Sequence, residues 1–311
     1  MELITENERN VIERHHIEEY NFKKRKDKIM SKILVTGCNG QLGRAINQKY
    51  EGNSAYEIVN TDVQELDITN VDAVVKLVDE VKPDVIINCA AHTNVNKCES
   101  DWDNAYKINA IGPRNLSIAA TKVQAKMMHI STDYVFDGTA TVPYKEFDAT
   151  NPCGAYGKTK LEGEKFVQQF SNRFYIVRTA WLYGDGNNFV RTMLNLAKTN
   201  DEVRVVRDQF GSPTSTRVLA DIIAALIETD NYGIYHGTCE GSCSWADFTE
   251  EIFRLAGVNT KVKHITTEEY PTPAKRPAYS VLEKYMLKLT MDYTVEDWKT
   301  AIQEYIQNGL V

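Results

Sequence analysis

The sequence of 311 residues has no apolar run near the ~18 residues that a membrane-spanning helix requires. Its N-terminus carries charged residues where a signal peptide would need an apolar core. Basic residues are concentrated only at residues 23–26 (KKRK), and 36 basic against 43 acidic residues give a net charge of −7. We therefore expect a cytoplasmic globular protein with neither a membrane nor a nucleic acid as partner.

Cysteine and histidine are both scarce, and neither forms a metal-binding pattern. The six cysteines are scattered along the chain, which fits reduced thiols better than a disulfide framework. Cys239 and Cys243 are the one close pair, and no companion pair lies at zinc-ligand spacing. The six histidines form no HxxxH or HxH cluster. The sequence therefore indicates no metal site.

A glycine-rich segment follows the first expected strand, residues 32–36. Its glycines have GxxGxxG spacing, and a helical stretch follows to Tyr50. Glycine is needed where a chain turns sharply or approaches a pyrophosphate, and the helix N-terminus offers free N–H groups to the phosphates. The pattern predicts a dinucleotide-binding loop made by Gly37, Asn39, Gly40, Gln41, Leu42 and Gly43.

An acidic residue, Asp62, ends the second expected strand at residues 56–61. It lies where a carboxylate binds the adenosine ribose 2′-hydroxyl, and it would repel a 2′-phosphate, so NADH is favoured over NADPH. Asp67 and Ile68 follow in a loop that we expect to cover the adenine. An equal alternative for Asp67 is a position in the N-cap region of the next helix.

Small residues follow the third expected strand, residues 84–88, and they would let a cofactor lie close to the sheet. Ala90, Ala91, His92 and Thr93 are the candidates there. For His92, a purely structural hydrogen bond is the equal alternative. Strands alternate with helices, including a long helix over about residues 104–120, and this order predicts a Rossmann-type, doubly wound parallel sheet.

Tyr156 and Lys160 are four residues apart on an expected helix, so both side chains leave the same face. A tyrosine has a free pKa of about 10, and a neighbouring ammonium lowers that pKa toward the working range. Thr132 would come from the end of an apolar strand, where its hydroxyl can hold the oxygen that Tyr156 protonates. We interpret the three residues as a catalytic site for a carbonyl substrate.

The second half of the chain offers candidates for substrate binding. Trp181 lies in an aromatic loop, where stacking on a base and core filling are equal alternatives. Arg207 and Arg276 lie in polar loops and are candidate cations for a diphosphate. Helices are expected at about residues 216–228 and 244–256, the latter opened by Ser244 and Asp247. We expect a polar extension at residues 1–30, a dinucleotide-binding domain at 31–180, and a smaller, mixed substrate-binding domain at 181–311, with interleaved segments.

Together these segments resemble the dTDP-4-dehydrorhamnose reductases, a family of extended short-chain dehydrogenases/reductases. The resemblance runs from about Ser31 to the C-terminus. It is carried by residues 36–43 (TGCNGQLG), 89–93 (CAAHT), 131–138 (STDYVFDG), 156–160 (YGKTK), 208–214 (DQFGSPT) and 270–277 (YPTPAKRP). The STDYVFDG segment is the most specific of them.

The resemblance implies that NADH or NADPH delivers a hydride to C4 of dTDP-4-dehydro-β-L-rhamnose, giving dTDP-β-L-rhamnose. It implies a catalytic triad of Thr132, Tyr156 and Lys160. The implied cofactor contacts are residues 40–42, Asp62, 67–68 and 91–93, and the implied substrate contacts are Thr132, Asp133, Lys160 and Trp181. Some family members bind Mg²⁺ at a dimer contact through a glutamate, but Ala45 stands at that position here. The sequence thus gives Mg²⁺ no support and leaves a homodimer through another contact open.

Two other functions fit parts of the pattern. A nucleotide-sugar dehydratase similar to this chain would carry a glutamate after Thr132-Asp133, where Tyr134 stands here. That difference favours simple reduction over a dehydratase or epimerase. A non-catalytic, NAD(P)-binding regulatory subunit would be expected to have lost part of the triad, whereas this chain retains all three residues.

Overall fold

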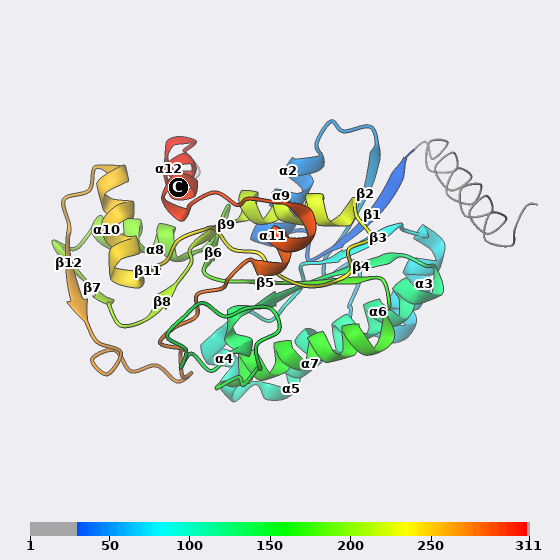
Figure 1. The fold of residues 1–311 in the computed structure, drawn as a ribbon, viewed down its shortest axis with the longest axis horizontal. Helices are drawn as coiled ribbons and strands as arrows, with labels where there is room; N and C mark the ends of the chain where they lie inside the picture. Colours follow the sequence, from blue (N-terminus) through cyan, green and yellow to red (C-terminus); the bar gives the residue numbers. More distant parts are fainter. Residues whose placement is uncertain (1–29, 310–311) are drawn as a thin grey trace, which may run out of the picture.

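A sheet of six parallel strands forms the centre of the computed structural model, which describes residues 30–309 (Figure 1). The strand order is β10-β5-β4-β3-β1-β2. The strands are β1 (Ser31–Thr36), β2 (Tyr56–Thr61), β3 (Val85–Asn88), β4 (Lys126–Thr132), β5 (Phe174–Thr179) and β10 (Gly233–His236). The predicted Rossmann-type α/β fold is therefore confirmed. The predicted extension at residues 1–30 lies outside the described residues, apart from Met30.

Successive strand residues alternate between two apolar cores, one on each face of the sheet. Leu34, Ile86, Met127 and Ile176 belong to one core, and Ile33, Ile87, Met128 and Val177 belong to the other. Helices α3 (Val71–Val81), α6 (Gly112–Lys122) and α7 (Ala155–Phe170) cover the first face, and α2 (Gln41–Tyr50) and α9 (Thr216–Ile227) cover the second (Figure 1). Burial on both faces explains why these strands have near-continuous apolar sequences.

The long helix that we predicted over about residues 104–120 is divided. Its parts are α5 (Trp102–Tyr106), a π-helical turn η1 (Lys107–Ile111) and α6, and the short α4 (Val95–Ser100) precedes them. Within the π turn, Asn109 is fully buried, donates to the His92 carbonyl (3.2 Å) and accepts from the His92 amide (2.8 Å). The turn therefore holds the segment that follows β3 against α7.

The second half of the chain forms a smaller mixed region beside the sheet (Figure 1). Its elements are β6 (Leu182–Tyr183), α8 (Phe189–Ala197), β7 (Glu202–Val206), β8 (Phe210–Gly211), β9 (Thr214–Ser215), β11 (Cys243–Ser244), α10 (Trp245–Ala256), β12 (Lys261–Ile265), α11 (Tyr285–Met291) and α12 (Trp298–Gln307). The predicted N-cap of α10 is confirmed as a capping box: the Ser244 side chain accepts from the Asp247 amide, and the Asp247 side chain accepts from the Ser244 amide. Strand β10 belongs to the central sheet, and helix α9 packs against one face of that sheet, although both come from the second half of the chain. The two halves therefore interleave.

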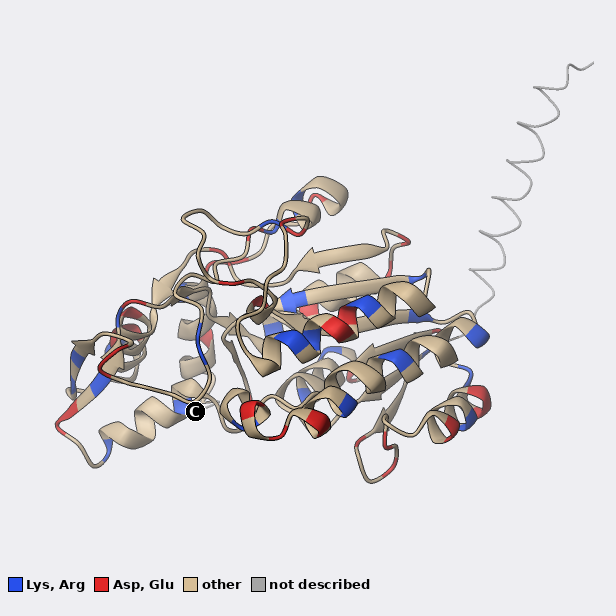
Figure 2. Cartoon of the chain, turned by 90° about the horizontal axis from the view of Figure 1, so that it is seen from below, with Lys and Arg blue, Asp and Glu red and all other residues tan. Residues whose placement is uncertain are grey.

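Charges of both signs are interspersed along the helices (Figure 2). Within residues 30–309, none of the helices is long and apolar enough to cross a membrane. All six cysteines are free thiols.

A buried ion pair joins β5 to α7. Arg178 donates to both carboxylate oxygens of Glu164, at 2.9 and 2.7 Å, and both side chains are at most 3% exposed. Ser131, near the end of β4, donates to the same carboxylate at 2.5 Å. Because every partner is satisfied, the pair can tolerate its loss of hydration.

We expect Arg178→Met to lower the free energy of unfolding by about 3–5 kcal/mol, because it leaves the Glu164 carboxylate buried without a counter-charge. Chemical denaturation monitored by circular dichroism measures the change. Arg254→Met is the matched control, since Arg254 makes the same two-bond pair with Glu251 at the surface and its loss should change stability little. Equal effects of the two substitutions would contradict this account.

Candidate active site

The glycine loop lies where β1 and β3 end side by side. Gly37 has φ +67°, and an added Cβ would lie 2.7 Å from the Ala90 amide nitrogen. At Gly43 an added Cβ would lie 2.5 Å from the Gly37 carbonyl oxygen. Only glycine fits both positions, and the loop places the N-terminus of α2 at the carboxyl edge of the sheet. This cradle fits a dinucleotide pyrophosphate.

A cavity of about 620 Å³ extends from this loop across the carboxyl edge of the sheet. The predicted residues that line it are Asn39, Gly40, Gln41, Leu42, Gly43, Ala91, Thr93, Thr132, Asp133, Tyr156, Lys160, Trp181 and Arg276. Glycine loop, triad and candidate substrate residues thus share one cavity. A volume of this size can hold a large ligand.

Helix α7 carries both Tyr156 and Lys160, with Gly154 as its N-cap. Thr132 ends β4, and its hydroxyl lies beside the Tyr156 phenol, where it favours the phenolate form. Close approach of α7 to residue 134 requires Gly157, because a Cβ there would lie 2.1 Å from the Tyr134 carbonyl oxygen. The arrangement brings a hydroxyl, a phenol and an amine to one wall of the cavity.

Lys160 is almost fully buried, and its Nζ donates to the Ile130 carbonyl at 2.6 Å. Burial lowers the pKa of Lys160 to about 8, although the nearby Glu164 and Cys89 favour its charged form. The lysine can therefore change its protonation state near pH 8.

Burial raises the pKa of the Tyr156 phenol, and the nearby Asp133 and Tyr134 add to the increase. Our prediction that this pKa is lowered toward the working range is wrong for this arrangement, because burial of the phenol outweighs the effects that favour the phenolate. Tyr156 consequently remains a protonated phenol at neutral pH, which is the form that can donate a proton.

Comparisons with known proteins agree with this geometry. The family model described as the RmlD substrate binding domain matches residues 30–311. A dTDP-4-dehydrorhamnose reductase of Aggregatibacter actinomycetemcomitans is 42% identical and covers 88% of this chain and 98% of its own. The chain belongs to the RmlD family of dTDP-4-dehydrorhamnose reductases.

Two solved structures of RmlD-family reductases share the fold. The enzyme from Clostridium acetobutylicum is 60% identical with a TM-score of 0.88, and the match covers 90% of this chain and 100% of that one. The Bacillus anthracis enzyme, solved in complex with NADP, is 42% identical with a TM-score of 0.88, covering 90% and 99%.

Seven predicted residues do not line the cavity of this RmlD-family chain: Gly37, Asp62, Asp67, Ile68, Ala90, His92 and Arg207. Asp62 lies beside the glycine loop and accepts from the Asn39 amide at 3.1 Å. Asp67 is exposed and accepts from Thr69, which fits its structural alternative. His92 faces the Cys98 thiol at 3.2 Å, which fits its structural alternative too.

Ile68 is buried, and its carbonyl accepts from Asn115 at 3.0 Å. Arg207 is exposed beyond the end of β7. Gly37 and Ala90 contact each other behind the loop, so they shape the cavity without facing it.

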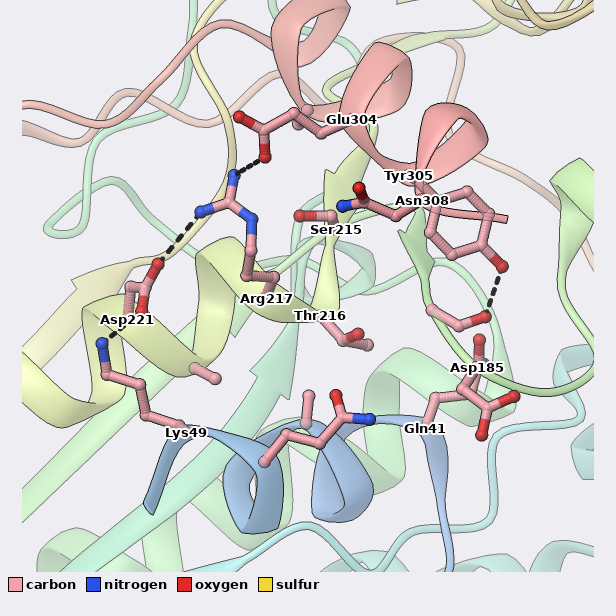
Figure 3. A pocket seen from close by; sticks show the side chains of 15 residues that line it. Gln41, Lys49, Asp185, Ser215, Thr216, Arg217, Asp221, Glu304, Tyr305 and Asn308 are labelled. Carbon is pink, nitrogen blue, oxygen red and sulfur yellow. Dashed lines mark hydrogen bonds and ion pairs between the residues drawn. The ribbon is translucent and has the colours of Figure 1, made fainter. Parts of the chain in front are cut away.

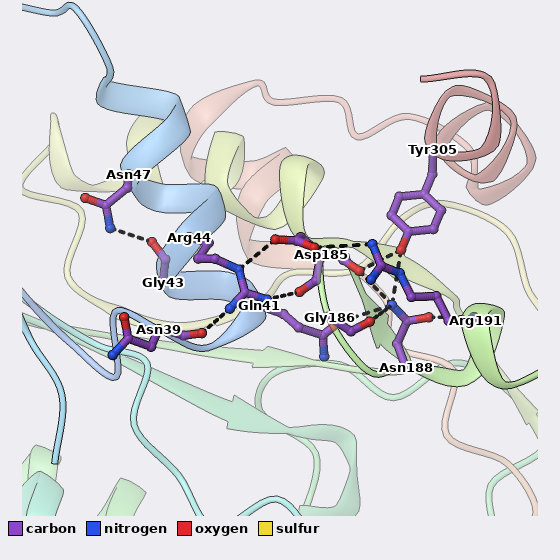
Figure 4. Close-up of polar contacts among 11 residues, drawn as sticks. Asn39, Gln41, Gly43, Arg44, Asn47, Asp185, Gly186, Asn188, Arg191 and Tyr305 are labelled. Atoms are coloured by element: carbon purple, nitrogen blue, oxygen red, sulfur yellow. Dashed lines mark hydrogen bonds and ion pairs between the residues drawn. The ribbon is translucent and has the colours of Figure 1, made fainter. Parts of the chain in front are cut away.

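Sequence reasoning missed several residues that line the cavity, and two of them, Arg44 and Trp245, make contacts that shape it. The rings of Trp245 and Trp181 stack with centroids 3.5 Å apart. Figure 4 shows Arg44 between the glycine loop and a second loop at residues 184–188. Its guanidinium donates to the Asn39 carbonyl and pairs with the Asp185 carboxylate at 2.9 Å. The contact of Arg44 with Asp185 and that of Trp181 with Trp245 join positions far apart in the sequence, and no spacing rule signals them.

A second cavity of about 290 Å³ lies between α2, α9 and α12 (Figure 3). Arg217 pairs there with Asp221 (3.2 Å) and Glu304 (2.9 Å), and Ala45 lines the wall. No group of three or more His, Cys, Asp or Glu side chains within residues 30–309 is arranged as a metal site. Since alanine supplies no ligand and the carboxylates already surround an arginine, these residues do not fit the Mg²⁺ of some family members.

Asp133 is buried, and burial raises its pKa to about 6 although the Ser280 and Thr132 hydroxyls favour the carboxylate. In this group the folded protein holds its proton more tightly than the unfolded chain. Ionisation of Asp133 therefore destabilises the folded protein, and this loss of stability develops as the pH rises from about 4 to 6.

We expect Asp133→Asn to stabilise the protein by about 1–3 kcal/mol above pH 6, with the gain vanishing toward pH 4. Urea denaturation at several pH values measures it. Asp137→Asn is the control of opposite sign, because hydrogen bonds from Thr139 lower the pKa of Asp137 to about 2. That variant should lose stability above pH 4, and a pH-independent effect of Asp133→Asn would contradict the assignment.

Proposed function

We propose that this chain reduces the C4 keto group of dTDP-4-dehydro-β-L-rhamnose to give dTDP-β-L-rhamnose, with NAD(P)H as reductant. The observation that carries the proposal is that Thr132, Tyr156 and Lys160 line the same cavity as the glycine loop. Relatives of 42% identity bear the name of this reductase, and one relative was solved with NADP. The direct test is oxidation of NADH and NADPH with the dTDP-4-keto-6-deoxy sugar, checking the product for the L-rhamno configuration.

For the cofactor, the proposed contacts are Gly37 and residues 39–43 under the pyrophosphate, Asp62 at the adenosine ribose, and residues 67–68 at the adenine. Residues 90–93, together with Tyr156 and Lys160, are the proposed contacts toward the nicotinamide. The bound cofactor supplies the hydride to C4. Tyr156 donates its phenolic proton to the C4 oxygen, because burial keeps that phenol protonated. Thr132, which donates to Asp133 at 2.9 Å in the structure, turns its hydroxyl to the same oxygen.

For the substrate, Asp133 and Trp181 are the proposed sugar and base contacts. Arg276 lines the cavity and is the proposed cation for the diphosphate. Arg207, which we also predicted for this role, is exposed and outside the lining, so the geometry supports Arg276 over Arg207.

Two further properties belong to this proposal. A cytoplasmic location is supported by the six free thiols, which suit a reducing compartment. A homodimer remains a prediction, and such a dimer would do without a Mg²⁺ bridge at Ala45.

We expect Asp62 to favour NADH, since its carboxylate can accept the ribose hydroxyls and repels a 2′-phosphate. Asp62→Ala should narrow the difference in kcat/KM between NADH and NADPH. Glu65→Ala is the control, because Glu65 is a carboxylate of the same turn that accepts from the Asp62 amide at 2.9 Å. A wild-type preference for NADPH of tenfold or more would make the assignment wrong.

Tyr156→Phe should bind NADH nearly as wild type does in a fluorescence titration, because the ring is retained. Its kcat should fall at least about a hundredfold, since general acid catalysis commonly contributes ~10²–10⁴-fold. Tyr134→Phe is the matched control, because the ring of Tyr134 packs edge-on against that of Tyr156, with centroids 5.6 Å apart. Loss of the Tyr134 hydroxyl should lower kcat far less. Turnover near wild type in Tyr156→Phe would assign the proton to another donor, with His92 or Asp133 as the next candidates.

A further inference from the structure

A buried row of polar side chains runs beneath the cavity from β1 to α7. Thr36 donates to the Asn88 side-chain oxygen at 2.8 Å, and Asn88 Nδ2 lies 3.2 Å from His129 Nδ1. His129 Nε2 in turn lies 3.5 Å from the Nζ of Lys160. All four residues are at most 2% exposed, so water does not compete for these groups.

The backbone fixes the orientation of Asn88. The Ala90 amide donates to the Asn88 side-chain oxygen at 3.1 Å. An N–H group cannot accept a hydrogen bond, so the oxygen of Asn88 must face Ala90 and its NH₂ group must face His129. A flipped amide would leave the Ala90 N–H opposite another donor.

The orientation of Asn88 selects the tautomer of His129. Because Asn88 donates to it, Nδ1 of His129 must be the unprotonated nitrogen. Burial and the nearby Lys160 lower the pKa of His129 far below its usual value, so the ring is neutral. A neutral ring without a proton on Nδ1 carries it on Nε2, and that N–H points at Lys160.

The amine of Lys160 meets different partners in its two protonation states. An ammonium donates to the Ile130 carbonyl but also directs positive charge at the His129 N–H. A neutral amine keeps the bond to Ile130 and offers its lone pair to that N–H. The other titratable groups facing Lys160 are Glu164, on its own helix, and Cys89, after β3. Arg178 already pairs with the Glu164 carboxylate, which reduces its pull on the lysine.

We propose that His129 is a positioning residue whose Nε2–H, directed by Asn88 and the Ala90 amide, favours the neutral amine of Lys160. The proposal rests on the function proposed above, in which Lys160 contacts the nicotinamide end of the cofactor beside Tyr156. Burial already lowers the pKa of Lys160 to about 8, and the His129 N–H acts in the same direction. A reaction step that uses the Lys160 ammonium should therefore slow above that pH.

The decisive experiment follows the protonation of Lys160 directly, without cofactor or substrate. The protein is labelled with ¹³C at lysine Cε, the Lys160 signal is identified by its loss in Lys160→Met, and its pH titration is recorded by NMR. In His129→Asn the side-chain oxygen can still accept from Asn88, but no N–H reaches Lys160. We expect the titration midpoint to move upward by about one pH unit.

Two variants sharpen the test. Thr36→Val is the matched control, because it removes a bond to Asn88 while the Ala90 amide still fixes the orientation, so the midpoint should not move. His129→Gln can turn its amide oxygen to the ammonium and should also raise the midpoint, and it replaces His129→Asn if that variant does not fold. An unchanged midpoint in the folded His129 variant overturns the proposal.

Turnover separates this proposal from the proposed function. In an active enzyme, the alkaline limb of the pH profile of kcat/KM should move upward with the NMR midpoint in His129→Asn. A shifted midpoint in a protein with no reductase activity would support the role of His129 and refute the proposed function. Normal reductase activity with an unshifted midpoint would refute the role of His129 alone.

Discussion

The ion pair between Arg178 and Glu164 sets the position of helix α7, which carries Tyr156 and Lys160. Glu164 lies one turn beyond Lys160 on α7, and Arg178 comes from β5 within the central sheet. Ser131 donates to the same carboxylate and directly precedes Thr132, so the end of β4 is tied to the same point. Two charges can remain buried here because the carboxylate receives three donors and Arg178 also reaches the Glu146 carbonyl at 3.2 Å. Contacts in the interior of the protein thus position Thr132, Tyr156 and Lys160.

Burial also sets the chemistry of the wall that this helix forms. It raises the pKa of Tyr156 and of Asp133 and lowers the pKa of Lys160, so all three groups are shifted toward their neutral forms. A site that disfavours charge at rest is suited to a reaction in which a proton must arrive as a charged oxygen develops. The sign of the tyrosine shift could not be read from the YxxxK spacing. It is set by the burial of the phenol and by the neighbouring Asp133 and Tyr134, which only the fold brings together.

The sequence was informative where short-range rules apply and silent where distant residues meet. The apolar composition of short segments and their alternation with helical stretches predicted the strands. The GxxGxxG spacing predicted the tight turn at Gly37, which in the structure packs against Ala90. The capping pair predicted the start of α10. Arg178 within an apolar strand was an overlooked signal, because a buried charge requires a buried partner. The Arg44 contacts had no such signal, since Asp185 lies 141 residues away along the chain.

The loop at residues 184–188 follows the predicted domain boundary at residue 180 but contacts helix α2 of the first half of the chain. Asn188 of this loop donates to the side chain of Gln41, at 3.3 Å, and Arg44 holds Asp185 (Figure 4). A few residues earlier, Trp181 adopts φ +49°, a conformation that costs energy for a side chain of this size. The strain is held by the stack on Trp245 and by Gly211, where an added Cβ would meet the indole at 2.5 Å. Residues 181–188 therefore form the aromatic wall of the cavity at Trp181 and also contact the glycine-loop helix, so displacing one of these contacts must disturb the other.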